Sequence, residues 1–160
     1  MEEKDIKTVK TTRGELRYYR DWDNYDGGIV MLNAQTIDRY KAIKNEHPDA
    51  DKCGVFFAFS REQFAEGYKR LVELGHIKDG DKICQDKGTG AFGTEAGLAA
   101  FFKFYDDSRA AIPKECDPQE VYFYEYNNHE CMIAWDGDKD AYDLIVGYWG
   151  EEVAKTIKRI

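Results

Sequence analysis

The amino-acid sequence predicts an α+β fold, with a mainly antiparallel sheet and helices packed against it. Two observations lead to this prediction. An apolar run at residues 55–59 passes directly into a helical pattern, and alternating side chains around a polar turn at residues 121–135 are typical of a β-hairpin. A length of 160 residues without a low-complexity linker fits a single domain over residues 1–160.

The N-terminal part of the chain carries weaker signals. Residues 1–12 are polar, and we expect them to be disordered. Bulky apolar side chains at residues 15–19 indicate a strand. Asn33 is a suitable N-cap for a helix that continues to about Glu46.

The clearest local signal is the strand and helix around residue 60. Ser60 at the N-cap and Gln63 at N3 form the pattern of a capping box. Phe59 and Phe64 are placed to form a hydrophobic staple. We expect residues 55–147 to be the best-defined core of the domain.

Three elements are predicted in the second half of the chain. Thr94 is suited to cap a helix that continues to about Ser108. In the hairpin, tyrosines alternate along the first strand and residues 127–130 form the turn. A helix follows and ends at Gly150, and we assign Trp135 and Trp149 to hairpin and core packing.

The charge is unevenly distributed. The chain has 23 basic and 31 acidic residues, a formal net charge of −8, and residues 101–150 hold 4 basic and 11 acidic side chains. Such a stretch repels phosphate backbones, so we expect no direct binding to nucleic acid. It can attract a basic protein surface or cations, although a solvated acidic face that aids solubility is the ordinary interpretation.

The sequence also predicts a cellular location. A run of about 18 apolar residues is absent and the first residues are charged, so we expect neither a membrane span nor a secretory signal. The four cysteines form no CxxC pair. Without a secretory signal, we expect reduced thiols in a cytoplasmic protein.

The first candidate site is the glycine-rich segment before the helix at Thr94. Gly88, Gly90 and Gly93 match the GxGxxG pattern, in which bare backbone approaches a pyrophosphate at a helix N-terminus. The acidic residue that such a fold places after a second strand has no counterpart here. A flexible loop is the ordinary interpretation, and an anion held by backbone amides stays open.

The second candidate site is the turn of the predicted hairpin, with Glu125, Asn128, His129 and Glu130. A histidine among carboxylates and amides can be a general base, a metal ligand or a recognition tip. The histidine and two nearby cysteines would supply only three zinc ligands, without paired spacing, so we predict no metal. A turn without chemistry is the ordinary alternative.

A third group begins like a calcium-binding EF-hand loop, with Asp136, Asp138 and Asp140. The glycine that this motif needs at its sixth position is Ala141, and the glutamate at its twelfth is Gly147. A turn before a helix is therefore favoured, and a weak cation site stays open. No nucleophile elbow, zinc-protease motif or P-loop is present, so we predict no catalytic residue and no cofactor.

Two stretches carry a resemblance to known proteins: residues 56–67, which begin FFAFS, and residues 124–130, YEYNNHE. They resemble a group of small uncharacterised proteins from bacteria and phages, classed as a domain of unknown function. The resemblance covers roughly residues 55–147. It implies a small cytoplasmic protein carried on a mobile element, and it implies no activity.

Two functional hypotheses follow. The first is a small acidic interaction or regulatory protein without catalytic activity, whose basic protein partner is released by salt. A DNA mimic is one variant, although a charge of −8 is modest for that role. The alternative is a small-molecule or nucleotide-binding protein, in which Gly88–Gly93 holds an anion and Glu125, His129 and Glu130 act as acids and bases. That alternative requires the two segments to converge in one pocket.

Overall fold

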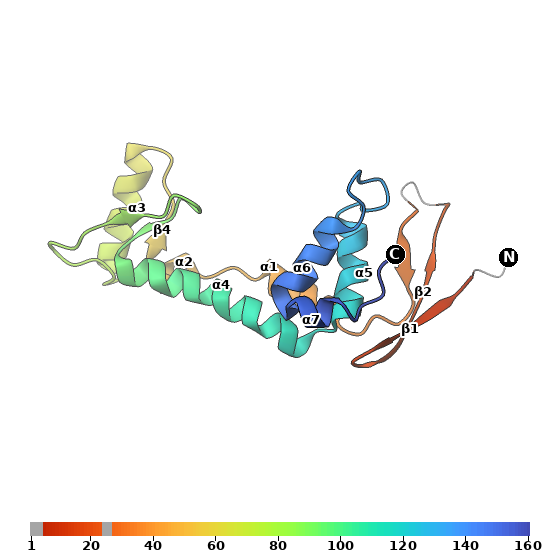
Figure 1. The fold of residues 1–160 in the computed structure, drawn as a ribbon. Helices are drawn as coiled ribbons and strands as arrows, with labels where there is room; N and C mark the ends of the chain where they lie inside the picture. Colours follow the sequence, from red (N-terminus) through yellow and green to blue (C-terminus); the bar gives the residue numbers. More distant parts are fainter. Residues whose placement is uncertain (1–4, 24–26) are drawn as a thin grey trace. The chain divides into compact units, whose positions relative to one another are not determined.

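A computed structural model describes residues 5–23 and 27–160 (Figure 1). The described residues form two compact units. The first comprises the chain up to Asn45 together with Arg109–Ile160, and the second comprises Glu46–Ser108. Within the described residues, helices accompany two small antiparallel sheets, which confirms the predicted α+β fold.

The first unit contains a sheet whose three strands run in the order β1-β2-β3, antiparallel throughout. Leu16 and Tyr18 on β2 are buried and alternate with exposed residues, so one face of the strand packs on the core. The strand predicted at residues 15–19 is therefore confirmed. The strands are β1 (Lys7–Thr11), β2 (Gly14–Arg20) and β3 (Ile29–Met31).

The expected disorder of residues 1–12 is wrong for residues 7–11, which form β1; residues 1–4 lie outside the described residues. Val9 pairs with Leu16 across the ladder and packs against the core. The backbone N–H and hydroxyl of Thr12 donate to Asp117 at 2.7 and 2.6 Å. This tether to a residue far along the chain is invisible in the local sequence.

The first unit contains α1 (Ile37–Asn45), α5 (Pro118–Asn128), α6 (Lys139–Trp149) and α7 (Glu151–Ala154). Helix α5 is the central one. Helix α1 begins later than predicted because Asn33 does not cap it: its Oδ1 accepts from the Arg17 N–H at 2.5 Å, and its side chain also binds the Glu15 carbonyl. Figure 1 shows α5 beside α6, and it also contacts α1 and the sheet.

The β-hairpin predicted at residues 121–135 is wrong, because helix α5 and a loop occupy this segment. Asp117 caps the helix by accepting from the N–H groups of Gln119 and Glu120 at 2.9 and 3.1 Å, and Pro118 stands in the first turn. Because neighbours cover α5 on several sides, its buried residues show no helical period. The alternating tyrosines therefore gave the sequence pattern of a strand, although the segment is helical.

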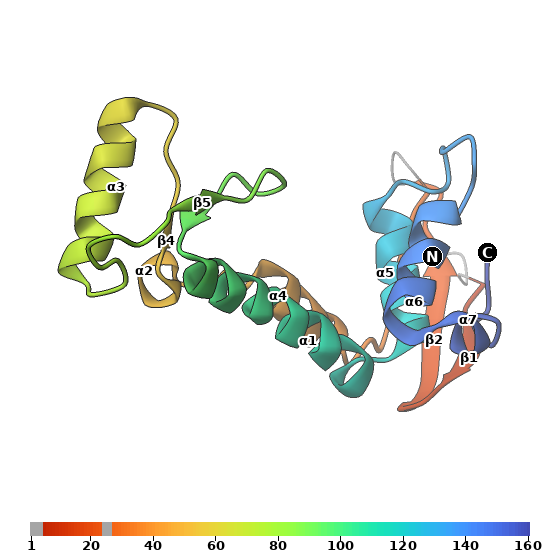
Figure 2. The same ribbon diagram turned by 60° about the vertical axis from the view of Figure 1, so that its left-hand side comes forward.

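The second unit holds a sheet in the order β4-β6-β5, in which β4 precedes helix α3 and β6 precedes helix α4 along the chain. Strands β5 and β6 form a hairpin, and Figure 2 shows their connecting loop projecting beyond the strands. The elements are α2 (Ala50–Cys53), β4 (Val55–Phe56), α3 (Arg61–Glu73), β5 (Cys84–Gln85), β6 (Phe92–Gly93) and α4 (Glu95–Glu115). The last residues of α4 belong to the first unit.

The capping box of α3 is confirmed. Ser60 Oγ accepts from the Gln63 N–H at 3.2 Å, and Gln63 Oε1 accepts from the Phe59 N–H at 2.8 Å. The hydrophobic staple is wrong, because the Phe59 residue is 94% exposed. Phe64 packs instead against Phe56, with ring centroids 5.2 Å apart, and so joins the hydrophobic cluster that includes Leu71.

Candidate functional site at the end of helix α5

The polar segment after α5 ends a helix rather than turning a hairpin. The Glu130 N–H donates to the Asn127 carbonyl at 3.1 Å, and the Cys131 N–H donates to the Tyr126 carbonyl at 3.0 Å. These two bonds define a Schellman motif. Glu130 has a φ of 49°, in the left-handed region that glycine usually occupies at this position. The absence of glycine hid the helix end in the sequence.

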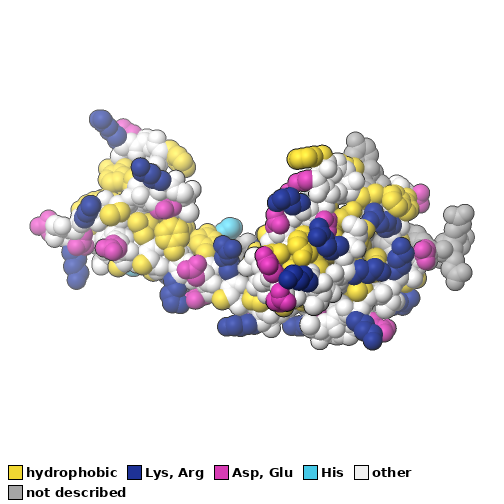
Figure 3. All heavy atoms as spheres, in the orientation of Figure 1, with side chains coloured by type: hydrophobic (Ala, Val, Ile, Leu, Met, Phe, Trp, Pro, Cys, Tyr) yellow, Lys and Arg dark blue, Asp and Glu magenta, His cyan; other side chains and the backbone are white. Residues whose placement is uncertain are grey.

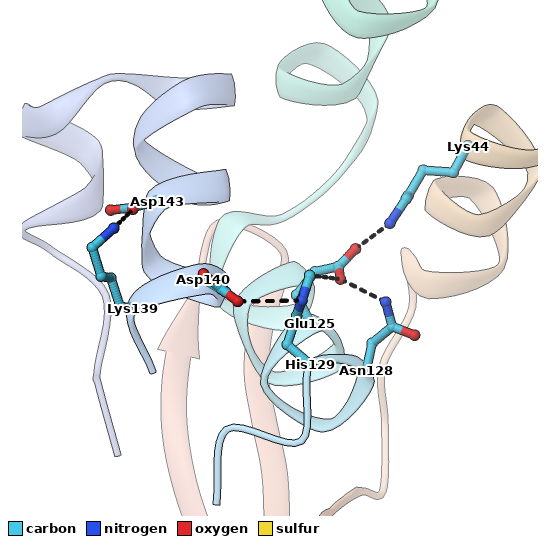
Figure 4. A network of polar contacts seen from close by, with 7 residues as sticks. All are labelled: Lys44, Glu125, Asn128, His129, Lys139, Asp140 and Asp143. Carbon is cyan, nitrogen blue, oxygen red and sulfur yellow. Dashed lines mark hydrogen bonds and ion pairs between the residues drawn. The ribbon is translucent and has the colours of Figure 1, made fainter. Parts of the chain in front are cut away.

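Glu125 is the buried centre of the candidate site (Figure 4). Its Oε1 accepts hydrogen bonds from the Tyr40 hydroxyl at 2.5 Å and from Lys44 Nζ at 2.6 Å. Its Oε2 accepts from Asn128 Nδ2 at 3.0 Å and lies 3.3 Å from His129 Nε2. The carboxylate therefore joins α1 to the last turn of α5.

Burial by itself raises the pKa of Glu125. Hydrogen bonds from Lys44, Tyr40 and Asn128, with the charge of Lys44, outweigh burial and hold that pKa below its usual range. Burial first, and then the Glu125 carboxylate, raise the pKa of Tyr40 well above its usual range. At neutral pH the site thus contains an ionised carboxylate and a phenol that stays a donor.

His129 connects this buried group to solvent. Its side chain is 35% exposed, and Nδ1 lies 3.9 Å from Asp140 Oδ2 on the first turn of α6. The imidazole therefore stands between a buried and an exposed carboxylate, as Figure 4 shows. Carboxylates on both sides orient the ring.

An open pocket of about 580 Å³ adjoins His129 within the first unit. Its lining combines cationic, anionic and apolar groups, which suits a small polar ligand. None of the described lining residues is a serine, threonine or cysteine. The lining residues are Lys44, Arg109, His129, Asp140, Asp143, Leu144, Gly147 and Tyr148.

The glycine-rich loop is the turn between β5 and β6, and its backbone amides are largely engaged. Asp86 Oδ2 accepts from the Thr89 N–H at 2.6 Å and from its hydroxyl at 2.8 Å, and the Asp86 carbonyl accepts from the Gly90 N–H at 2.8 Å. Gly90 has a φ of +78°. The Asp86 carboxylate thus occupies the place that an anion would take.

Of the other two glycines of this motif, Gly93 has a packing role. A Cβ on Gly93 would stand 2.8 Å from the Gly54 carbonyl oxygen, so glycine lets β6 approach that backbone. A Cβ on Gly88 would stand 3.3 Å from Asp86 Oδ2. Ligand binding by Gly88, Gly90 and Gly93 stays a prediction that the loop geometry disfavours.

In the acidic segment before α6, Asp138 forms a structural ion pair with Arg159. Asp138 accepts from Arg159 Nε at 2.8 Å, from its NH2 group at 2.6 Å and from the Tyr122 hydroxyl at 2.6 Å. Hydrogen bonds from Arg159, outweighing burial, lower the pKa of Asp138. Among the described residues, no three His, Cys, Asp or Glu side chains are grouped to hold a metal ion.

The structure brings three predicted site residues together, namely Glu125, Asn128 and His129. Glu130 is exposed beside them, and the three glycines lie in the second unit. Tyr40 and Lys44 were missed because a partner far along the chain defines their role. Their separation of one helical turn on α1 was the only signal in the sequence.

The loop between α5 and α6 presents a feature that the sequence did not predict. The Trp135 residue is 97% exposed and Ile133 is 68% exposed, so the assignment of Trp135 to hairpin packing is wrong. Trp149 does pack against the core, as predicted. Figure 3 shows further hydrophobic side chains at the surface, interspersed with charged ones.

Residues 39–158, which extend from α1 past α7, match one protein-family model. The chain belongs to the family of unknown function DUF7659. The DUF7659 match includes the pocket and the exposed loop, and it begins after the β1–β3 sheet. No curated protein and no solved structure matches the chain. Within the described residues of this DUF7659 protein, no helix combines the length and the apolar character needed to cross a membrane.

Proposed function

We propose that this DUF7659 protein is a small acidic interaction or regulatory protein without catalytic activity, which docks on a basic protein partner through the loop between α5 and α6. The observation that carries the proposal is the 97% exposure of Trp135, with Ile133 two residues away. Tryptophan is enriched among the residues that dominate binding energy, and loops on a rigid scaffold often carry them.

The loop is preordered by the residues around Trp135. Cys131 is buried and Met132 packs against the core at one end, and Arg159 anchors Asp138 at the other. Between them, the Ala134 N–H donates to the Glu130 carbonyl at 3.2 Å. A loop that is already ordered loses little conformational entropy on binding, which favours affinity.

The charge around the exposed side chains defines the partner class. Glu130, Asp136 and Asp140 are exposed in or beside the loop, and residues 101–150 have a strong acidic excess. A partner with lysines or arginines around an apolar cleft complements this surface. Anionic nucleic acid and anionic lipid do not.

The cellular setting is part of the proposal. We place the protein in the cytoplasm of a bacterium, with its gene carried on a phage or another mobile element, as the sequence resemblance implies. The four cysteines are free thiols in the structure, which is compatible with a reducing compartment.

The nucleotide-binding alternative has less support in its original form. The amides of Thr89 and Gly90 already donate within their own loop. Binding of an anion by Gly88–Gly93 would require these bonds to break. The pocket beside Glu125 and His129 is a separate site from this loop.

The test is affinity capture with two matched variants. Trp135→Ala removes the exposed indole of the loop, and Phe59→Ala removes an equally exposed ring from the second unit. We expect the wild type and Phe59→Ala to retain the same protein, Trp135→Ala to lose it, and added salt to release it. Equal retention by Trp135→Ala would refute docking through this loop.

A further inference from the structure

We infer that the pocket beside His129 binds a small organic anion, in which a carboxylate or phosphate is attached to a flat apolar body. The site uses Arg109, Lys44 and one face of α6, and it shares only Asp140 with the acidic surface around the docking loop. The inference does not depend on the proposed interaction function, because neither Trp135 nor Ile133 lines the pocket.

An unpaired cation points to the anionic part of the ligand. The other charged lining groups have partners: Lys44 binds Glu125, Asp140 faces His129, and Asp143 pairs with Lys139. The Arg109 guanidinium forms no hydrogen bond or ion pair with any residue in the ranges 5–23 and 27–160. A carboxylate or phosphate would supply the acceptor atoms that match its planar donors.

The face of α6 points to the flat apolar part. Asp140, Leu144, Gly147 and Tyr148 follow one another at helical spacing and line the same pocket. Glycine is unfavourable within a helix relative to alanine, yet Gly147 has no unusual backbone angle that requires it. Apart from its two chain neighbours and the backbone of its own helix, no described atom lies within 4 Å of the position that its Cβ would take.

Gly147 is exposed and leaves open space on the face of α6 that lines the pocket together with Leu144 and Tyr148. A planar ring fits such a space, and the Tyr148 ring offers a stacking or edge contact. Asp140 at the rim can accept a hydrogen bond from a hydroxyl or amino group of the ligand. Aromatic carboxylates and nucleoside monophosphates share this combination of ring and anion.

The test is isothermal titration of the full chain with adenosine monophosphate, benzoate and inorganic phosphate at millimolar concentration. We expect saturable binding of at least one of the two organic anions and weaker binding of phosphate, which has no apolar body. The preference between the two organic probes distinguishes a phosphate source from a carboxylate source. Absence of saturable binding for both organic probes, or tighter binding of inorganic phosphate, would overturn the inference.

Two variants test the location. Arg109→Gln removes the unpaired cation, and Gly147→Leu fills the open space; each should weaken binding by roughly tenfold or more. Arg61→Gln removes an exposed charge from the second unit and should leave binding unchanged. Thermal unfolding of Gly147→Leu should show no loss of stability, so weaker binding cannot be ascribed to unfolding. Wild-type affinity in both pocket variants would refute this site.

Discussion

Lys44 Nζ on α1 lies 2.6 Å from Glu125 Oε1 on α5, and this ion pair joins two helices that the sequence separates widely. The Glu125 side chain is fully buried, whereas 34% of the Lys44 side chain is exposed. A buried carboxylate depends on its partners, because water cannot replace them. The two partners therefore differ in how much their loss destabilises the protein. Removing Lys44 leaves a buried carboxylate without its counter-ion, whereas removing the Glu125 carboxylate leaves a lysine that can be hydrated by solvent.

Lys44→Met should accordingly be strongly destabilising. Removing one partner of a buried ion pair costs about 3–5 kcal/mol, and we expect the lower end because Tyr40 and Asn128 still bind Glu125. Urea unfolding followed by circular dichroism measures the change. The matched control is Lys103→Met, which breaks an exposed pair with Asp107 and should cost less than about 1 kcal/mol. Equal effects of the two substitutions would contradict this account.

Stability should fall in acid through Glu125 and Asp138. The folded pKa of each group lies below its ordinary value, so each contributes stability above its unfolded pKa of roughly 4. That contribution is lost as the pH falls through the folded pKa. Urea midpoints should therefore decrease from about pH 5 downward, and less steeply in Glu125→Gln than in the wild type. If the urea midpoints of the wild type and Glu125→Gln fell equally below pH 5, Glu125 would not contribute to the loss of stability in acid.

Elements with local signals were predicted from the sequence. Ser60 and Gln63 cap α3 with their own neighbours, and Thr94 accepts from the Gly97 N–H at 3.1 Å as an N-cap of α4 should. Each signal lies within a few residues of the structure that it predicts. Helix α4 nevertheless continues past the predicted end at Ser108 to Glu115, with Pro113 in its last turn.

Helix α5 shows why the rest was missed. Its sequence combines tyrosines and valine, which favour strands, with polar side chains that are buried on tertiary partners. Glu120, for example, accepts from the N–H and hydroxyl of Thr36 at 2.8 and 2.5 Å. The Asp117-Pro118 cap was the available signal. The candidate site had the same difficulty, since Glu125 was identified but its partner Lys44 lies on another helix.

Glu130→Gly should stabilise the protein. Glu130 holds a left-handed φ of 49° at the position after the α5 C-cap, where glycine has no steric penalty. We expect a gain of about 1 kcal/mol, measured as a higher thermal midpoint. Glu130→Ala keeps the penalty of the Cβ and provides the control, because it should show little or no gain. A stabilisation of similar size by alanine would point to removal of charge instead.

Asp138→Asn should loosen the loop that presents Trp135. The substitution removes the charge that binds Arg159 through two nitrogens, at a cost of about 1–3 kcal/mol. Hydrogen exchange should become faster at residues 131–137 than in the wild type. Asp136→Asn, in the same loop but exposed, should leave exchange unchanged. Unaltered exchange in Asp138→Asn would show that other contacts hold the loop.

Two helical glycines should respond oppositely to the same substitution. A Cβ on Gly97 in α4 would stand 2.4 Å from the Gly54 carbonyl oxygen, whereas a Cβ on Gly147 in α6 would meet no described atom within 4 Å apart from its chain neighbours and its own helix backbone. Gly97→Ala forces backbone apart and should destabilise by about 1–3 kcal/mol, despite the better helix propensity of alanine. Gly147→Ala gains that propensity, up to about 1 kcal/mol, without a clash. Urea unfolding of both variants checks the signs, and a stable Gly97→Ala would mean that α4 and the Gly54 turn can separate without cost.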